Sequence, residues 1–372
     1  MTKAAELAKM GEVLTNSQIG GRRNIVINGA MQVAQRSTSE TGLGASSGYF
    51  TLDRFYMIEN TASAGRFTMS QSAVTDLEGF SNALKIDCTT ADTSIAAGEA
   101  LIIQQKIEGF NAQQLKATST TTRAMTLSFY AKSNASRAIA SEIAMSNGTN
   151  NSASKLHTIG TSWARYTFTV PAASSTQIDN DNSNEMQVNF WLHAGSTFTS
   201  GTMSASLEAV TNANRAAGIG SIFASTDNEI EITGIQLELG SQATPFEHRS
   251  FGEELDLCYR YYIKYHAGGS GTFSRIALGF MRTSTNLRAL FTYPREMRST
   301  PALDDDNAGN YHVEDAGGNS DVDATVASIS QGGLQTCLVN FTTGSLTNND
   351  PAHVGINNST DSLVGLGFDA EL

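Results

Sequence analysis

The sequence has few charged residues and few cysteines, and each scarcity excludes a class of protein. Charged side chains make up 16% of the 372 residues, against about a quarter in typical soluble domains. The three cysteines, Cys88, Cys258 and Cys337, are far apart and odd in number. That arrangement is typical of neither a disulfide framework nor a CxxC metal or redox motif. We therefore expect three buried thiols.

Long apolar runs are missing as well. No stretch approaches the roughly 18 apolar residues of a membrane span. The start, MTKAAELAKMGEV, lacks the apolar core of a signal peptide. The net charge of -12 repels phosphate backbones and anionic lipid at long range. We therefore expect synthesis and folding in a cytoplasm, with no nucleic-acid partner and no membrane insertion.

Motifs of catalysis and metal binding are also absent. There is no HExxH or Walker-type loop, and the histidines lie in no motif. The acid pair Glu253 and Glu254 is explained by charge at a helix start. The run from Asp179 to Glu185 resembles the opening of a calcium loop, but Phe190 falls where the last carboxylate is needed. We expect a non-enzymatic protein with no catalytic residue, no metal site and no cofactor.

The sequence does contain short apolar runs of period two, separated by Ser, Thr, Asn and Gly. Between residues 21 and 247 these runs indicate the half-buried strands of one β-sandwich. In EIEITGIQLELG the apolar set changes phase at Gly234, which predicts a β-bulge. In RAMTLSFYAK and MQVNFWLHA the predicted core side carries Met125, Leu127, Phe129, Ala131, Val188, Phe190 and Leu192.

Residues 2–14 have helical periodicity, because Leu7, Met10 and Leu14 recur at spacings of three and four. One short apolar stripe cannot fold alone, so it needs sister helices or another protein as a partner. A frayed chain start, which Gly11 favours, is the alternative. We assign residues 1–20 as an N-terminal helical attachment segment.

A second helix is predicted over residues 251–265. Ser250 followed by Glu253 forms a capping box. We assign residues 248–268 to a linker helix that packs at a domain junction or at an oligomer axis. The residues on its apolar side that we expect to make such contacts are Leu255, Cys258 and Tyr262.

From residue 269 to the end, period two resumes and predicts a second, smaller β-sandwich. The predicted fold class is therefore all-β, with a short N-terminal helix, a first sandwich over residues 21–247, a linker helix and a C-terminal sandwich over residues 269–372. Apolar residues alternate in several runs, among them Ile276, Leu278 and Phe280; Leu287, Ala289 and Phe291; Cys337, Val339 and Phe341; Leu366 and Phe368.

Trp191 is the best candidate for a ligand site. A sugar site needs flat aromatic faces beside planar hydrogen-bonding groups, and alternation in MQVNFWLHA places Trp191 away from the core, beside Asn189 and His193. The alternative is that a loop or a neighbouring subunit covers Trp191. Three further residues on polar faces would join the site if their strands lie in the same sheet, namely Tyr130, Trp163 and Arg165.

Four segments together resemble the tail-fibre and related structural proteins of tailed bacteriophages. They are NIVINGAMQVAQRSTS at 24–39, YFTLDRF at 49–55, GIQLELGSQATPFEHRSFGEELDLCYRYY at 234–262 and FTYPREMRSTPAL at 291–303. The first sandwich is also similar to jelly-roll carbohydrate-binding modules. Such modules often hold a structural calcium through an Asp just before the last strand, where this sequence has Gly234.

The resemblance implies a jelly roll followed by a linker helix and a terminal β-domain. It further implies a virion protein, assembled in the host bacterial cytoplasm, that forms a homotrimer, docks on other virion proteins through its N-terminal segment and contacts host cell-surface polysaccharide. A purely architectural virion protein, such as a head fibre or an adaptor, is the alternative. A polysaccharide-degrading tailspike is disfavoured, because the sequence has no solenoid repeat and no acid pair on a strand.

Overall fold

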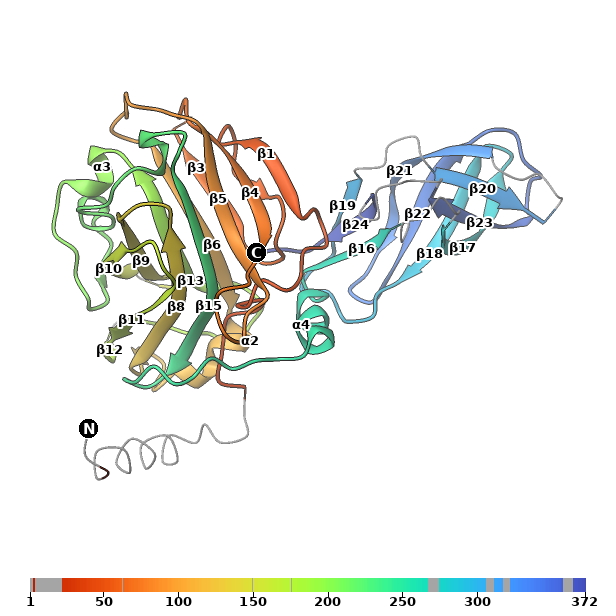
Figure 1. Cartoon of the computed structure of the whole chain (residues 1–372). Coiled ribbons are helices and arrows are strands. Elements are labelled where there is room, and N and C mark those ends of the chain that lie inside the picture. The colour runs from red at the N-terminus through yellow and green to blue at the C-terminus, as the bar shows by residue number, and fades with distance from the viewer. Residues whose placement is uncertain are drawn as a thin grey trace. The chain divides into compact units, whose positions relative to one another are not determined.

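The computed structural model describes residues 22–372 apart from residues 62, 149, 175, 267–273, 306–310, 317–321 and 357–363, and before residue 22 it describes Lys3 alone. The predicted N-terminal stripe of Leu7, Met10 and Leu14 lies outside the described residues. Strands dominate both of the compact units into which the chain divides (Figure 1). The predicted all-β fold class is confirmed. Within the described part of the chain, none of the helices has the length and apolar content needed to cross a membrane.

The first unit contains the described residues up to Ala34, then Thr38–Phe251 and Leu372. It is a jelly-roll type sandwich of two antiparallel sheets (Figure 1). The six-stranded sheet has the order β1 (Ser39–Leu43), β4 (Arg66–Ala73), β5 (Asn82–Thr90), β15 (Glu229–Leu239), β8 (Met125–Ser133) and β11 (Ala164–Val170). The seven-stranded sheet has the order β14 (Glu208–Ala209), β10 (Asn151–Ile159), β9 (Arg137–Met145), β13 (Asn184–Ala194), β6 (Ala100–Glu108), β3 (Tyr56–Asn60) and β2 (Gly48–Tyr49).

Short elements connect these strands. They are the strand pair β7 (Thr121–Thr122) and β12 (Ala173–Ser174), the helices α2 (Gly109–Ala112) and α3 (Ser196–Thr199), and the 3-10 turns η1 (Gln113–Leu115), η2 (Asn212–Asn214) and η3 (Ile222–Ala224).

The inner faces of the two sheets bury one apolar core, and the predicted alternation in β8 and β13 is confirmed. Burial of a large apolar side chain stabilises the fold by about 1.5–3 kcal/mol. The three free cysteines are also buried, as expected. The predicted core residues of β8 and β13 that lie in this cluster are Met125, Leu127, Phe129, Ala131, Val188, Phe190 and Leu192.

The predicted β-bulge at Gly234 is also confirmed. The pairing of β15 with β8 shifts register between Thr233 and Gln236, and Gly234 has a φ of +61°. A Cβ atom at Gly234 would lie 2.8 Å from a ring carbon of Phe80 and 2.8 Å from one of Tyr130. Glycine is therefore needed here both for its backbone conformation and for the close approach of two aromatic rings.

The observed linker helix begins at the predicted residue but ends earlier than predicted. The helix α4 is Phe251–Cys258, and the chain then forms strand β16 (Tyr262–His266). Strand β16 pairs with β24 (Gly365–Asp369) along its whole length. The run YYIKYH is rich in aromatic residues, which favour a strand once a pairing partner is present.

Two of the three residues predicted to contact another subunit through this helix are core residues of the second unit. Cys258 and Tyr262 are fully buried. The Tyr262 hydroxyl donates to Asp304 Oδ2 at 2.9 Å, and the Arg36 guanidinium lies 3.6 Å from its ring centroid. The prediction is wrong for Cys258 and Tyr262, because side chains that are fully buried within one chain cannot reach another copy. Leu255 is half-buried.

The second unit contains Gln35–Ser37 and Gly252–Glu371. One part is the three-stranded sheet β16, β24 and β19 (Ala302–Asp305). The other part is a closed barrel, where a second sandwich was predicted. It closes because β23 pairs with β17 on one side and with β20 on the other, which leaves no free edge. The barrel order is β17 (Ser274–Thr283), β18 (Asn286–Thr292), β22 (Thr336–Thr343), β21 (Val322–Gly332), β20 (Tyr311–Asp315) and β23 (Pro351–Ile356).

The barrel carries an exposed apolar row on its outer surface. Leu278 is 73% exposed, Leu290 is 52% exposed and Phe280 is 46% exposed. Leu278 and Leu290 are direct partners in the pairing of β17 with β18. Leu278 and Phe280, which alternate with Ile276 in the predicted strand, therefore face solvent. The pairing of β17 with β23 is irregular between Arg275 and Ala277, so the phase of the alternation changes within the strand.

Candidate functional site

Trp191 and Asn189 lie on the outer side of the seven-stranded sheet, as alternation predicts, but neither is open to solvent. The outward direction predicted for His193 is wrong, because a β-bulge after Trp191 places His193 opposite the core residue Leu101. All three are 0% exposed. The Trp191 indole N–H donates to Glu142 Oε2 at 3.0 Å, and its ring centroid lies 5.2 Å from that of Phe198. The prediction of an open sugar-binding face at these three residues is therefore wrong.

A loop covers this face, which is the alternative that the sequence left open. Arg215 binds both carboxylate oxygens of Glu142, at 2.7 and 2.8 Å. Its guanidinium also lies 4.7 Å from the Trp191 ring centroid. Asn189 donates to the same carboxylate at 2.8 Å. The covering segment, residues 195–224, is thus fixed by a bidentate ion pair, which is the strongest common geometry for arginine and carboxylate.

The imidazole of His193 is likewise occupied. Its Nδ1 lies 2.8 Å from Ser221 Oγ and its Nε2 lies 3.2 Å from Glu99 Oε2. Burial lowers the pKa of His193 more than the neighbouring Glu99 carboxylate raises it. His193 therefore acts as a neutral structural group that joins β13 to the covering segment.

The six residues predicted to form one site lie on two different sheets. Trp191 is on β13 of the seven-stranded sheet, whereas Tyr130 is on β8 and Arg165 is on β11 of the six-stranded sheet. The six residues therefore do not form a single site, because that would require all their strands to lie in one sheet. Three of the six do come together on the outer side of the six-stranded sheet, where Tyr130 and Arg165 are direct cross-strand partners and Trp163 directly precedes β11.

We call this region the outer aromatic patch and define it by Phe80, Tyr130, Trp163, Arg165 and Phe246. Its rings contact one another, because the Phe80 centroid lies 5.2 Å from that of Tyr130 and 5.1 Å from that of Phe246. Tyr130, Trp163 and Phe246 are half-buried. The patch therefore offers aromatic surface to solvent on a rigid sheet.

The indole of Trp163 is held in one orientation by two charged neighbours. Its N–H donates to Asp76 Oδ1 at 2.8 Å. The Lys132 ammonium lies 3.1 Å from Asp76 Oδ2 and 4.9 Å from the Trp163 ring centroid. The hydrogen bond from Trp163, followed by that from Lys132, lowers the pKa of Asp76. Asp76 is therefore a carboxylate at neutral pH and orients both partners.

Sequence reasoning missed the loop residues of the patch and its surroundings. Phe80 and Asp76 lie in the connection between β4 and β5, while Phe246 and His248 follow β15. Strand periodicity carries no information about such connections. Lys132 was detectable, because it lies two residues after Tyr130 on the same face of β8.

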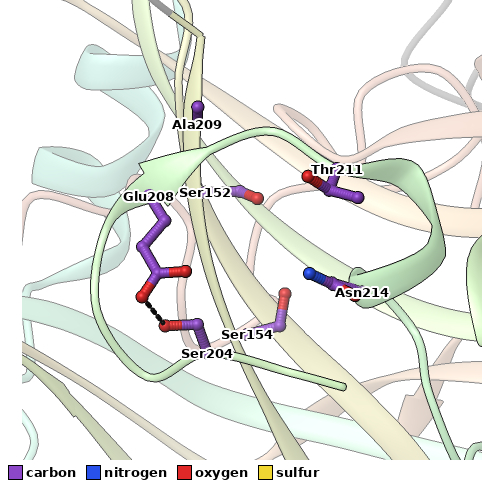
Figure 2. Close-up of a pocket in the computed structure, with 7 residues that line it drawn as sticks. All are labelled: Ser152, Ser154, Ser204, Glu208, Ala209, Thr211 and Asn214. Atoms are coloured by element: carbon purple, nitrogen blue, oxygen red, sulfur yellow. Dashed lines mark hydrogen bonds between the residues drawn. The ribbon is translucent and has the colours of Figure 1, made fainter. Parts of the chain in front are cut away.

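A separate polar hollow of about 240 Å³, counting its open mouth, lies beside β10 (Figure 2). Within it the Ser204 hydroxyl donates to the Glu208 carboxylate at 2.9 Å. Its lining has hydroxyl, amide and carboxylate groups but no aromatic ring, so it provides no surface on which a pyranose could stack. The lining residues are Ser152, Ser154, Ser204, Glu208, Ala209, Thr211 and Asn214.

The run that resembles a calcium loop forms an ordinary turn. Asp181 accepts hydrogen bonds from the Ser183 backbone N–H at 2.9 Å and from its hydroxyl at 3.2 Å. Among the residues that the structure describes, no group of three His, Cys, Asp or Glu side chains could hold a metal ion.

No model of a known protein family matches the sequence, and no curated protein matches it. Structural neighbours are carbohydrate-binding modules and a phage tailspike domain. The enzymatically active domain of bacteriophage CBA120 tailspike protein 4 is 14% identical with a TM-score of 0.28, and the match covers 58% of this chain but 21% of the tailspike chain.

Two carbohydrate-binding modules match over their full length or nearly so. TmCBM61, solved with β-1,4-galactotriose, is 10% identical with a TM-score of 0.27, and the match covers 59% of this chain and all of the module. The family 11 module of a cellulosomal cellulase from Clostridium thermocellum is 12% identical with a TM-score of 0.27, and the match covers 56% of this chain and 99% of the module. At such identities and TM-scores, the likeness does not establish a shared function.

Proposed function

We propose that the chain is a virion protein of a tailed bacteriophage, assembled in the host cytoplasm, whose first unit binds host surface glycan without catalysis. The resemblance of the sequence to tail-fibre proteins supports the virion part. The outer aromatic patch carries the binding part, because it combines the half-buried rings of Trp163 and Tyr130 with the planar guanidinium of Arg165.

The geometry of the patch suits a sugar ring. Aromatic faces bind the C–H surface of a pyranose, and planar donors match its hydroxyls. The Trp163 indole is already oriented by Asp76 and Lys132. Binding therefore costs little side-chain entropy at Trp163, which is the advantage of a preorganised site.

The charges of the patch favour binding over hydrolysis. Hydrolysis of a glycosidic bond needs two carboxyl groups that flank the bond, one of them protonated. Asp76 and Glu231 both contact the Lys132 ammonium, at 3.1 and 3.7 Å. The Asp76 carboxyl is kept ionised by its lowered pKa. Burial raises the pKa of Glu231, but its side chain is only 14% exposed. We therefore expect neither carboxyl to act as the general acid.

Replacing Trp163 by alanine is expected to weaken binding to bacterial surface polysaccharide by about tenfold or more, because a stacking ring is lost. Unfolding free energy should fall by less than about 1 kcal/mol, since Trp163 is half-buried. The measurement is binding to an array of bacterial surface polysaccharides, followed by thermal melting of each variant.

The matched control is Trp163→Phe, which keeps a flat ring and should retain most of the affinity. Equal binding by the wild type and Trp163→Ala would contradict the proposed site. Release of reducing ends from any bound polysaccharide would contradict the absence of catalysis.

The same proposal includes a homotrimer that is attached to other virion proteins through residues 1–20. The exposed apolar row of Leu278, Phe280 and Leu290 supports contact with a second copy, because exposed apolar patches commonly mark association sites. Light scattering should give three times the 39.5 kDa mass of one chain, and Leu278→Ser should shift the mass towards one chain.

Thr292→Ser, an exposed change on β18, is the matched control and should leave the trimer intact. A wild-type monomer at micromolar concentration would refute self-association. An intact trimer that binds no polysaccharide would instead favour the purely architectural virion protein.

A further inference from the structure

Arg165 differs from the other cations on the outer side of the six-stranded sheet. Lys85 contacts Glu229, and Lys132 contacts Asp76 at 3.1 Å. No carboxylate of the described residues lies within ion-pair distance of Arg165. Of these three cations, Arg165 is therefore the one that an anionic ligand at the patch could pair with directly.

The guanidinium of Arg165 is held in place by neutral groups. Its Nη2 donates to Ser128 Oγ at 2.9 Å and to the carbonyl oxygen of Thr244. Its central carbon lies 5.9 Å from the Tyr130 ring centroid. These contacts use one nitrogen of three, and in the described part of the chain Nε and Nη1 have no acceptor. Arg165 thus keeps donors available while its position is fixed.

We infer that the ligand of the outer aromatic patch is a glycan of acidic sugars, and that Arg165 binds the sugar carboxylate. This inference rests on the proposed glycan binding. Both hydrogens of Nη2 are engaged by Ser128 and Thr244, so the free Nε and Nη1 each offer a single charge-assisted hydrogen bond. Such a bond to a carboxylate oxygen is stronger than one to a neutral hydroxyl. Trp163 and Arg165 are two residues apart, about 7 Å along a strand. A sugar ring on Trp163 can therefore place its attached carboxylate near Arg165.

The overall negative charge of the protein does not oppose this assignment at physiological salt. The net charge of -12 acts at long range, but the screening length at 0.15 M salt is about 8 Å. Close to the patch, Lys132 pairs with the carboxylates Asp76 and Glu231, and the buried Glu238 carboxylate accepts hydrogen bonds from Thr244. An acidic sugar therefore meets, at Arg165, a cation that no carboxylate of the described residues pairs with.

The test uses an array of bacterial polysaccharides, each printed in its native form and in a form whose carboxyl groups have been reduced to alcohols. The wild type should bind acidic polysaccharides and lose about 10- to 100-fold in affinity on the reduced forms, the range for a charge-assisted contact. Arg165→Gln should bind both forms equally weakly. Arg165→Lys should recover only part of the preference, because it restores the charge but loses the contacts with Ser128 and Thr244 that fix the guanidinium.

The matched control is Lys155→Gln, which removes the same charge from a lysine whose ammonium donates to the Thr167 carbonyl. It should leave the preference for acidic forms unchanged. Tight binding to reduced or neutral polysaccharides that is unaffected by Arg165→Gln would overturn the acidic-sugar inference and leave glycan binding intact. If no polysaccharide is bound by the wild type, the proposed function itself fails, and the inference fails with it.

Discussion

Replacing Trp191 by alanine is expected to lower the free energy of unfolding by about 3 to 5 kcal/mol, as much as replacing Phe190 by alanine. The two side chains point to opposite sides of β13, and both are buried, at 0% and 1% exposure. Phe190 belongs to the core between the sheets. Trp191 belongs to a smaller apolar cluster, with Phe198, beneath the covering segment.

Loss of the Trp191 indole has two costs. It leaves a large cavity beside Phe198, and it removes the donor that binds Glu142 Oε2 at 3.0 Å. Chemical denaturation followed by circular dichroism measures the effect. Trp163→Ala is the control, because Trp163 is the half-buried tryptophan of the chain. A loss below about 1 kcal/mol for Trp191→Ala would show that residues 195–224 do not cover this face in solution.

Acidification from pH 7.5 to pH 5 is expected to cost about 2 kcal/mol of stability through His157 alone, rising to about 3 kcal/mol near pH 4. Burial, and then the charge of Lys155, lower the pKa of His157 from 6.5 to about 4. Because the folded pKa is depressed, the unfolded chain takes up the proton first. The stability is therefore present above pH 6.5 and is lost as the pH falls towards 4.

The surroundings of His157 explain why it stays neutral. Its Nε2 lies 2.8 Å from Ser141 Oγ, and its ring contacts those of Phe129 and Tyr166 at centroid distances of 5.2 and 5.7 Å. Denaturation of the wild type and of His157→Gln at several pH values isolates its contribution, because the carboxylates titrate equally in both. Parallel pH profiles for the two proteins would mean that His157 is not the titrating group.

Strand periodicity predicted the strands and the bulge of the first unit because side-chain direction in a strand is a local property. It located the core side of β8 and β13 and the phase change at Gly234. Periodicity could not predict what lies above an outward-facing residue. Trp191 points outward as expected, but the segment that covers it contains short helical turns with no repeating pattern.

The errors in the second unit have a different cause. The run YYIKYH after Cys258 fits a helical apolar side as well as a strand, and only its pairing with β24, far along the chain, decides between them. In β17 the apolar residues Ile276, Leu278 and Phe280 alternate in the sequence, yet the irregular pairing after Arg275 leaves Leu278 facing outward. Closure of a barrel and the position of a bulge are set by long-range pairing, which a local pattern does not contain.

The segment Gln35–Ser37 belongs to the second unit although it lies far upstream of the rest of that unit, and this limits how genes for such a protein can recombine. Arg36 belongs to the second unit, where it stacks on Tyr262 and pairs with Asp369 at 2.9 Å. A single gene crossover near residue 252 would exchange the rest of that unit but leave Arg36 behind. The incoming Tyr262 and Asp369 would then need an arginine inherited from a different parent. Exchange of whole terminal units is therefore restricted to parents that agree at this short upstream segment.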